Sequence, residues 1–425
     1  MTGSRKRLMG IFGAAALSCL ALVLVGCDGD DGRDGLPGAE GPAGPVGPPG
    51  PPGGGGLEGG GAVSIGSGAD LSEETIAAIG GLIASIDSVS ISSPPVVEFT
   101  VTTIHGGPAE DIDPGNIWFT LAKLVPAADG KPSYWQSYIN RIETPSGDST
   151  PNVLDSALQA TTETGSTGTM EELGDGRYRY TFATDPANVT APVAIEYDPT
   201  APTRVGLEIR LDGEAEPLAP DNPVADIIPE TGEEVAPAKA IAATENCADC
   251  HVRFAQHGGP RRTVEYCVTC HNPGTIDQDT GESLDMAYMA HSIHLGESRA
   301  DYSTEPPTTI PYVVYGFMDF VHDYSEVTYP QSPLFCENCH EASEATPDGD
   351  AWASSSSASA CGGCHIAGLV ASDPDPVTGQ PTYVYNHQAV DFPAPDGLCV
   401  NCHVEGGAAG ATAANHFKGA KLEKA

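Results

Sequence analysis

The chain has 425 residues and a formal net charge of -39, with 58 acidic and only 19 basic side chains. Its 51 glycines, 37 prolines and 6% aromatic residues exclude one large, conventionally packed globule. The scarcity of Lys and Arg excludes a nucleic-acid-binding protein, because phosphate contacts need cationic side chains.

The N-terminus has the pattern of a targeting segment. Basic residues at 5–7 precede an uncharged apolar stretch over 8–25, which ends in small residues before Cys27. This pattern predicts a lipoprotein signal over 1–26 with Cys27 as the lipidation site. The alternative is a transmembrane anchor, since about 18 apolar residues can just span a bilayer. Both place the rest of the chain outside the cytoplasm, attached to a membrane.

Residues 27–62 are collagen-like. Glycine occupies every third position from Gly29 to Gly53, as a triple helix requires at its axis. We expect an extended stalk, with trimerisation through the stalk as the alternative.

Residues 63–94 are predicted to form a short helical or linker segment. Asp70 is the expected cap and Glu73 its capping-box partner, and a single stripe would contain Ile76, Ile79, Ile83 and Ile86.

Residues 95–235 are predicted to be a β-sandwich or small barrel. Apolar residues alternate at 97–101, 117–121, 178–182 and 205–211, between loops rich in Pro, Gly and Asp. No catalytic constellation is visible here, and His105 is expected at the surface. Residues 214–240, rich in Pro, Glu and Ala, are interpreted as a linker.

The chemistry lies in residues 236–425. Apart from Cys19 in the signal and Cys27, all cysteines belong to five Cys-x-x-Cys-His motifs: Cys247-Cys250-His251, Cys267-Cys270-His271, Cys336-Cys339-His340, Cys361-Cys364-His365 and Cys399-Cys402-His403. This is the attachment signature of c-type haem, in which two thiols bind the haem vinyl groups and the adjacent histidine becomes an iron ligand. Zinc sites, thioredoxin-like dithiols and disulfides are alternatives that do not explain the adjacent histidine.

Six further histidines lie in this half of the chain and supply candidate second axial ligands: His257, His291, His294, His322, His387 and His416. Five haems need five second axial ligands, so one of these six histidines is spare. Bis-histidine ligation leaves no open site on iron and is typical of electron transfer. The methionines nearby are interpreted as packing groups. With little apolar sequence of its own, this half is expected to be irregular chain and short helices around the haems.

Several stretches resemble the outer-membrane multihaem cytochromes of metal-reducing bacteria, the OmcA/MtrC family. They include FAQHGGPRR, CVTCHNPGTID, MAHSIHLGE and SEVTYPQSPLFCENCH, with IWFTLAKL, GDGRYRYTFA and RVGLEIR in the β region. The resemblance covers roughly residues 95–420. It implies split β-barrel domains alternating with pentahaem domains. It also implies distal ligands, which by position are His257, His291, His294, His387 and His416, with His322 as the spare histidine.

The resemblance further implies a lipoprotein on the cell surface. Such a protein takes electrons from a porin–cytochrome conduit or another multihaem cytochrome and passes them to metal oxides, flavins or soluble metal complexes. Members typically carry ten haems, whereas this chain has motifs for five. Asp28 after the lipidated cysteine leaves a periplasm-facing location as an alternative, since in some bacteria it retains lipoproteins in the inner membrane.

Two other functions remain as alternatives to an electron-transfer protein without classical enzyme activity. One is a multihaem reductase, which needs one haem with an open coordination site. The other is a structural haem filament or stalked oligomer.

Overall fold

The structure is a computed structural model that describes residues 60–128, 132–145, 154–235, 237–252, 254–301, 306, 308–330, 336–353, 357–364, 369–371, 383–387 and 392–394. Several predicted features lie outside these residues: the signal, the lipidation site Cys27, nearly all of the Gly-Xaa-Yaa segment, the fifth motif, His365 and His416. Among the helices in these ranges, none is long and apolar enough to cross a membrane.

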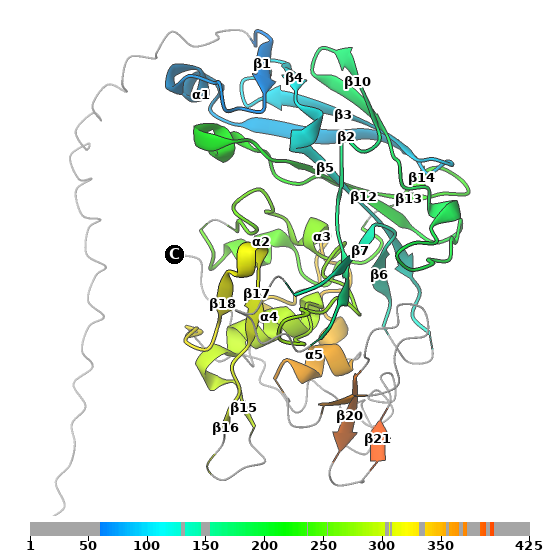
Figure 1. Cartoon of the computed structure of the whole chain (residues 1–425), viewed down its shortest axis with the longest axis vertical. Helices are drawn as coiled ribbons and strands as arrows, with labels where there is room; N and C mark the ends of the chain where they lie inside the picture. Colours follow the sequence, from blue (N-terminus) through cyan, green and yellow to red (C-terminus); the bar gives the residue numbers. More distant parts are fainter. Residues whose placement is uncertain are drawn as a thin grey trace, which may run out of the picture. The chain divides into compact units, whose positions relative to one another are not determined.

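Two sheets form the β region, which we define as residues 63–235 (Figure 1). The first is antiparallel, in the order β10-β11-β3-β2, and contains β2 (Leu82–Ser90), β3 (Val96–Thr103), β10 (Thr169–Gly174) and β11 (Arg177–Thr181). The second has the order β14-β13-β12-β5-β6, with β9 also paired to β5. It contains β5 (Ile117–Val125), β6 (Tyr134–Ser137), β9 (Glu163–Thr164), β12 (Thr203–Ile209), β13 (Val224–Ile228) and β14 (Glu233–Glu234).

Smaller elements complete the β region. Strand β1 (Val63–Gly66) pairs in parallel with β4 (Ala109–Ile112), and β7 (Asn140–Glu143) pairs with β8 (Ala157–Ala160). The helical turns are α1 (Glu73–Ile79), η1 (Pro114–Asn116), η2 (Pro186–Asn188) and η3 (Gly213–Leu218).

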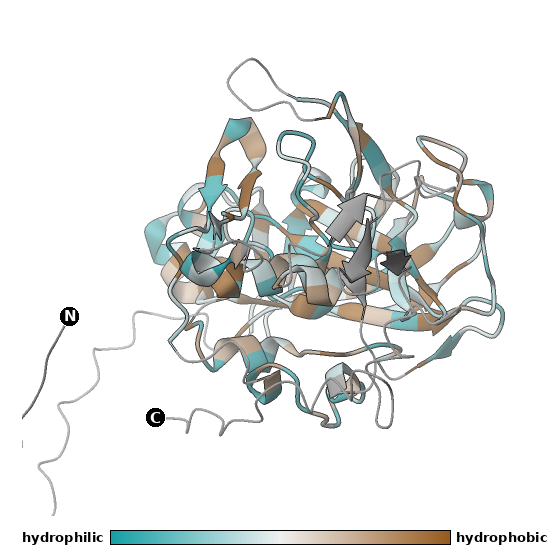
Figure 2. Cartoon of the chain, turned by 90° about the horizontal axis from the view of Figure 1, so that it is seen from below, coloured by the Kyte–Doolittle hydropathy of each residue, from teal (hydrophilic) through white to brown (hydrophobic). Residues whose placement is uncertain are grey.

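The main hydrophobic core lies between the two sheets. Phe99 of β3 meets Phe119 of β5 edge-on at 5.8 Å, and Phe119 stacks on Tyr180 of β11 at 4.2 Å. Each of these residues is at most 1% exposed, and full burial of such a side chain contributes roughly 1.5–3 kcal/mol. The predicted alternation is confirmed, because its apolar positions are the buried ones. Figure 2 shows hydrophobic and hydrophilic residues interleaved along the chain.

Two predictions at the edges of the β region are wrong. In the segment 63–94 the helix ends at Gly80, which has a left-handed φ of 68°, and Ser72 rather than Asp70 caps its start. Ile83 and Ile86 belong to strand β2, which pairs with β3. The proposed linker 214–240 contains η3, β13 and β14, and β13 pairs with β12 within the second sheet.

We call residues 236–425 the motif region. Its described part is irregular, as predicted, with short helices that gather in one place (Figure 1). The helices are α2 (Thr244–Ala248), α3 (Val264–Cys267), α4 (Met286–Leu295) and α5 (Ala358–Gly362), with turns η4 (Gly296–Ser298), η5 (Phe317–Asp319), η6 (Cys336–Asn338) and η7 (Ala351–Ala353). The strands are β15 (Ala300–Asp301), β16 (Thr308–Thr309), β17 (Val313–Tyr315), β18 (Val321–Asp323), β19 (Leu369–Ala371), β20 (Tyr383–His387) and β21 (Phe392–Ala394).

Candidate functional site

Each described Cys-x-x-Cys-His motif folds as a short helical turn. In the first, the backbone N–H of His251 donates to the carbonyl of Cys247 at 2.9 Å, and the second and third motifs repeat this bond at the same distance. With about 3.6 residues per turn, positions i, i+3 and i+4 lie on one side of a helix. The turn therefore presents both thiols and the histidine on a common face, as attachment to one haem requires.

The eight described motif cysteines are free thiols. Burial raises the pKa of the Cys247 and Cys267 thiols to about 12, and that of Cys364 to about 11. The neighbouring Cys339 thiol is the second cause at Cys247. Neutral thiols in apolar surroundings suit addition to an apolar macrocycle and are poor ligands for a bare metal ion, which binds thiolate.

Three motif histidines each face a histidine from outside their motif. The ring centres are 5.9 Å apart for His257 and His271, 6.1 Å for His251 and His294, and 6.1 Å for His291 and His340. We name these pairs with their cysteines site A (Cys267, Cys270, His271 and His257), site B (Cys247, Cys250, His251 and His294) and site C (Cys336, Cys339, His340 and His291).

These separations fit one metal atom between two imidazoles. A histidine nitrogen binds a first-row metal at roughly 2 Å, so a metal between opposed rings separates the ring centres by roughly 6 Å. Edge-on ring packing gives similar separations, as with Phe99 and Phe119 at 5.8 Å, so the distances count only together with the two thiols beside each pair. The distances, together with the adjacent thiol pairs, therefore fit a bis-histidine haem at all three sites.

The second ring nitrogen is occupied in four of the six imidazoles. The Nδ1 atoms of His271, His291, His294 and His340 lie 2.7–3.3 Å from the carbonyls of Leu284, Ala360, Ala290 and Ile241. A carbonyl can only accept, so each Nδ1 carries the proton and each Nε2 keeps its lone pair. A backbone carbonyl bonded in this way is the usual outer partner of a metal-bound histidine.

Burial keeps both imidazoles of site A, and His340 of site C, neutral. It lowers the pKa of His257 to about 2, with the charge of Arg261 as the second cause, and that of His340 to about 4. The pKa of His271 is also lowered, chiefly by burial. These histidines are therefore unprotonated at neutral pH, as metal ligands must be.

Helix α4 supplies one histidine to each of two sites. Asp285 caps its start by accepting from the N–H of Ala287 at 2.9 Å, and the N–H of Met286 donates to the carbonyl of His271 at 3.1 Å. The helix therefore starts beside site A. It then carries His291 to site C and His294 to site B.

A tight loop presents His257. The N–H of Gln256 donates to the carbonyl of Arg261 at 2.8 Å, and His257 has a left-handed φ of 56°. Gly258 and Gly259 follow with φ of 86° and 123°. This accounts for the HGG sequence: the loop reverses within a few residues and directs the imidazole to His271.

The other histidines have different places. His322 lies exposed on β18, with its ring 5.0 Å from Phe320 and 6.4 Å from Tyr324, so its role as the spare stays a prediction. His105 is exposed, as expected. His387 ends β20. Met318, expected to pack, is 80% exposed.

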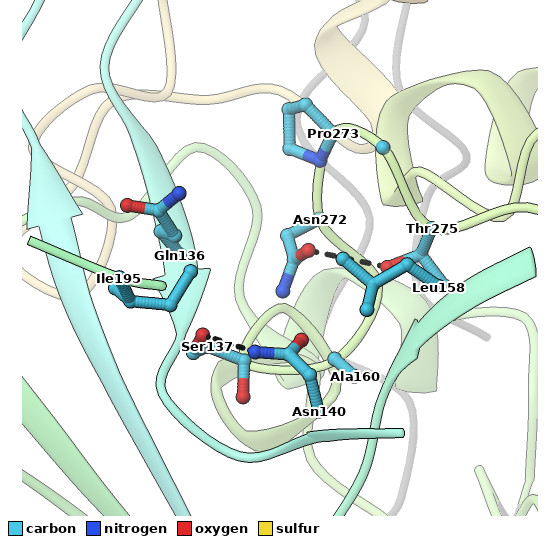
Figure 3. A pocket seen from close by; sticks show the side chains of 10 residues that line it. Gln136, Ser137, Asn140, Leu158, Ala160, Ile195, Asn272, Pro273 and Thr275 are labelled. Atoms are coloured by element: carbon cyan, nitrogen blue, oxygen red, sulfur yellow. Dashed lines mark hydrogen bonds between the residues drawn. The ribbon is translucent and has the colours of Figure 1, made fainter. Parts of the chain in front are cut away.

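A small pocket lies between the β region and the segment that follows His271 (Figure 3). Asn272 accepts a hydrogen bond from Thr275 at 3.2 Å on one side, and Asn140 donates to the carbonyl of Ser137 at 2.8 Å on the other. None of its ten lining residues is titratable. The pocket therefore offers no acid or base for catalysis.

Sequence reasoning missed a buried polar cluster between β12 and the second motif. Glu208 of β12 is fully buried and contacts Arg210, Arg261 and Tyr266. The signal was present in RVGLEIR, where a glutamate lies between the alternating apolar residues of a strand. Nothing in that stretch indicates Arg261 and Tyr266, which lie more than fifty residues later.

Comparisons with known proteins match both the β region and the motif region to cytochrome families. Residues 239–417 match the family described as outer membrane cytochrome MtrC/MtrF-like, domains II/IV, and residues 127–234 match the OmcA-like N-terminal domain. The multiheme cytochrome MtrC of Shewanella baltica (strain OS185) is 27% identical over 287 residues, covering 65% of this chain and 35% of that protein.

Two solved structures are similar. The crystal structure of the outer membrane decaheme cytochrome OmcA matches with a TM-score of 0.59 and 29% identity, over 67% of this chain and 43% of OmcA. The crystal structure of MtrC from Shewanella baltica OS185 matches with a TM-score of 0.47 and 23% identity. This match covers 76% of this chain and 43% of MtrC.

Fold and sites together define a multihaem c-type cytochrome. The chain belongs to the OmcA/MtrC family of outer membrane cytochromes, and it spans about a third of the length of the curated relative it matches.

Proposed function

We propose that the chain is an electron-transfer protein of the bacterial surface, which relays electrons through five bis-histidine c-type haems. The observation that carries this proposal is the set of three histidine pairs, each beside two thiols and each with ring centres about 6 Å apart. The relatives are outer membrane multihaem cytochromes by name, which supports the same role.

The cysteines of sites A, B and C would hold the haems covalently, and the paired histidines would supply both axial ligands. A bound haem supplies reversible one-electron chemistry. With both axial positions filled, substrate has no place on iron, so we favour electron relay over reductase activity. Backbone carbonyls bonded to Nδ1 hold the rings in orientation.

The sites form a connected series. Site A adjoins the start of α4, and α4 carries ligands of both B and C. Cys247 of site B lies within electrostatic reach of Cys267 of site A, and Cys339 of site C within reach of Cys247. His291 of site C bonds the carbonyl of Ala360, the residue before the fourth motif. We therefore propose that electrons pass in the order A, B, C and then the fourth motif, which differs from the order of motifs in the sequence.

The remaining assignments extend this proposal. The fourth and fifth motifs (Cys361, Cys364, His365 and Cys399, Cys402, His403) would bind haems with His387 and His416 as distal ligands. Residues 27–62 would be a lipid-anchored stalk, with the β region and the pentahaem motif region beyond it. The partners would be a porin–cytochrome conduit or another cytochrome, and the acceptors metal oxides, flavins or soluble metal complexes.

The test is a haem count with low-temperature EPR on the purified, as-isolated protein. Five haems per chain, all low-spin ferric, are expected. A stoichiometric high-spin signal would mean that one haem is open and would favour the reductase. A count below five haems per chain would mean that some motifs do not bind haem, and those motifs would drop out of the proposed relay.

A further inference from the structure

The buried carboxylate Glu208 connects the β region to site A. It is 0% exposed, and its Oε2 lies 2.9 Å from Nε of Arg261 and 2.9 Å from the hydroxyl of Tyr266, which donates to it. Its Oε1 lies 2.8 Å from Arg210. A buried carboxylate costs several kcal/mol unless it is paired, so these contacts fix Arg261 firmly.

Arg261 in turn closes the loop that carries His257. Its backbone exchanges two hydrogen bonds with Gln256, at 2.8 and 3.4 Å. The next residue is held as well, because the N–H of Arg262 donates to Oδ1 of Asn222 at 2.7 Å. The distal imidazole of site A is therefore held in place from the β region.

The charge of Arg261 reaches the whole of site A. It is the second cause, after burial, that lowers the pKa of His257, and it adds to the burial that lowers the pKa of His271. At Cys267 and Cys270, where burial raises the pKa, Arg261 opposes that effect. Glu208 acts in the opposite direction on Cys270. A cation and a carboxylate of the same ion pair therefore lie within electrostatic reach of one candidate haem.

We propose that Glu208 and Arg261 are positioning residues that hold His257 toward His271 and set the reduction potential of the haem at site A. This inference rests on the proposed function. Ferric haem carries one more positive charge than ferrous haem, so a nearby cation favours the ferrous state and raises the potential. A nearby carboxylate lowers it, and burial strengthens both effects.

The experiment compares four variants of the full-length haem protein by spectroelectrochemical titration with EPR. Arg261→Gln removes the cation and is expected to lower the potential of one haem. Glu208→Gln removes the carboxylate and is expected to raise the potential of the same haem. Arg261→Lys keeps the charge and should stay nearer the native value than Arg261→Gln. Glu98→Gln is the control, since Glu98 also pairs with an arginine, Arg179, but on the first sheet.

A purely structural role for the pair would give shifts of the same sign, or none beyond the control, and either result would overturn the inference. If Glu208→Gln does not fold, the comparison of Arg261→Lys with Arg261→Gln still tests the inference. Equal haem potentials in these two variants would contradict it. EPR of the unmodified protein comes first, because it tests the proposed function. Absence of low-spin haem in that protein would refute the proposed function and not the inference on Glu208 and Arg261.

Discussion

His291 and His294 lie three residues apart on helix α4 and serve different partners. The ring of His291 is 6.1 Å from that of His340, and the ring of His294 is 6.1 Å from that of His251. Because residues i and i+3 are neighbours on a helix surface, one turn of α4 bridges two candidate haems. Both rings are held by carbonyls, of Ala360 and Ala290, so the helix fixes both ligands.

This relationship predicts that His291→Met and His294→Met raise the potentials of two different haems. Methionine raises the potential of a haem relative to histidine. The expected shift is a fraction of the roughly 0.8 V that axial ligands span. Spectroelectrochemical titration with EPR would resolve the shifted haem in each variant. Met289→Leu, on the same helix, is the control. If either variant alone shifts the potentials of both haems, His291 and His294 do not belong to separate haems.

His257 and His322 are expected to differ. His257→Ala should produce one high-spin haem, because it removes the ring that faces His271 at 5.9 Å. His322→Ala should leave every haem low-spin, because the His322 ring lies exposed against Phe320 and Tyr324. The EPR spectra of the two variants check this. If His322→Ala creates the high-spin signal, His322 is a ligand and another histidine is the spare.

The sequence predicted what depends on short-range pattern. Alternation at Val97, Phe99 and Val101 identified a strand, and Cys-x-x-Cys-His spacing predicted haem-attachment motifs, which in the described residues fold as short helical turns. The stripe of isoleucines failed because a spacing of three residues fits one face of a helix but not one face of a strand. In β2, Ile83 is 53% exposed whereas Ile86 packs against the core. The glycines at 80 and 81 were the deciding signal, since Gly80 adopts the left-handed conformation that ends a helix.

Pairing of histidines could not be read from the sequence. His251 follows α2 and His294 lies on α4, forty-three residues later, and only the tertiary structure brings their rings to 6.1 Å. Likewise, Pro217 and the acidic residues of 214–240 suggested a linker. Strand β13 overrides that composition because Asp226 pairs with Arg204 of the adjacent strand β12.

That ion pair is expected to contribute much more to stability than a surface pair. Nε of Arg204 lies 2.6 Å from Oδ1 of Asp226, and both side chains are 2% exposed. Asp226→Ala leaves a buried guanidinium and should cost about 3–5 kcal/mol of unfolding free energy. Glu98→Ala breaks a solvent-exposed pair with Arg179 and should cost much less, because water and salt screen exposed charges. Denaturant unfolding of the haem protein would compare them, and equal losses would contradict this reading.

Gly206 of β12 is expected to be intolerant of a side chain. A Cβ there would lie 2.5 Å from Oγ1 of Thr120 and 2.7 Å from the ring of Tyr266, which packs on the strand. Gly206→Ala should therefore cost about 1–3 kcal/mol through overpacking. Oγ1 of Thr120 is buried without a hydrogen-bond partner, so adding Thr120→Ala should recover part of the loss. Unfolding midpoints of the single and double variants measure these losses of stability. A loss in the double variant that exceeds the sum of the two single losses would show that Thr120 is not the obstacle.

Haem is expected to be needed for the motif region but not for the β region. The main apolar core, from Val63 to Ile227, lies wholly in the β region. In the described part of the motif region few apolar side chains are buried, while pairs of histidines and buried thiols face one another. Chain produced without haem attachment should therefore lose structure beyond residue 236. Limited proteolysis should then leave a resistant fragment close to 63–235, whereas the haem-loaded protein resists cleavage further along. Equal resistance of the motif region in both forms would mean that polypeptide contacts alone hold it.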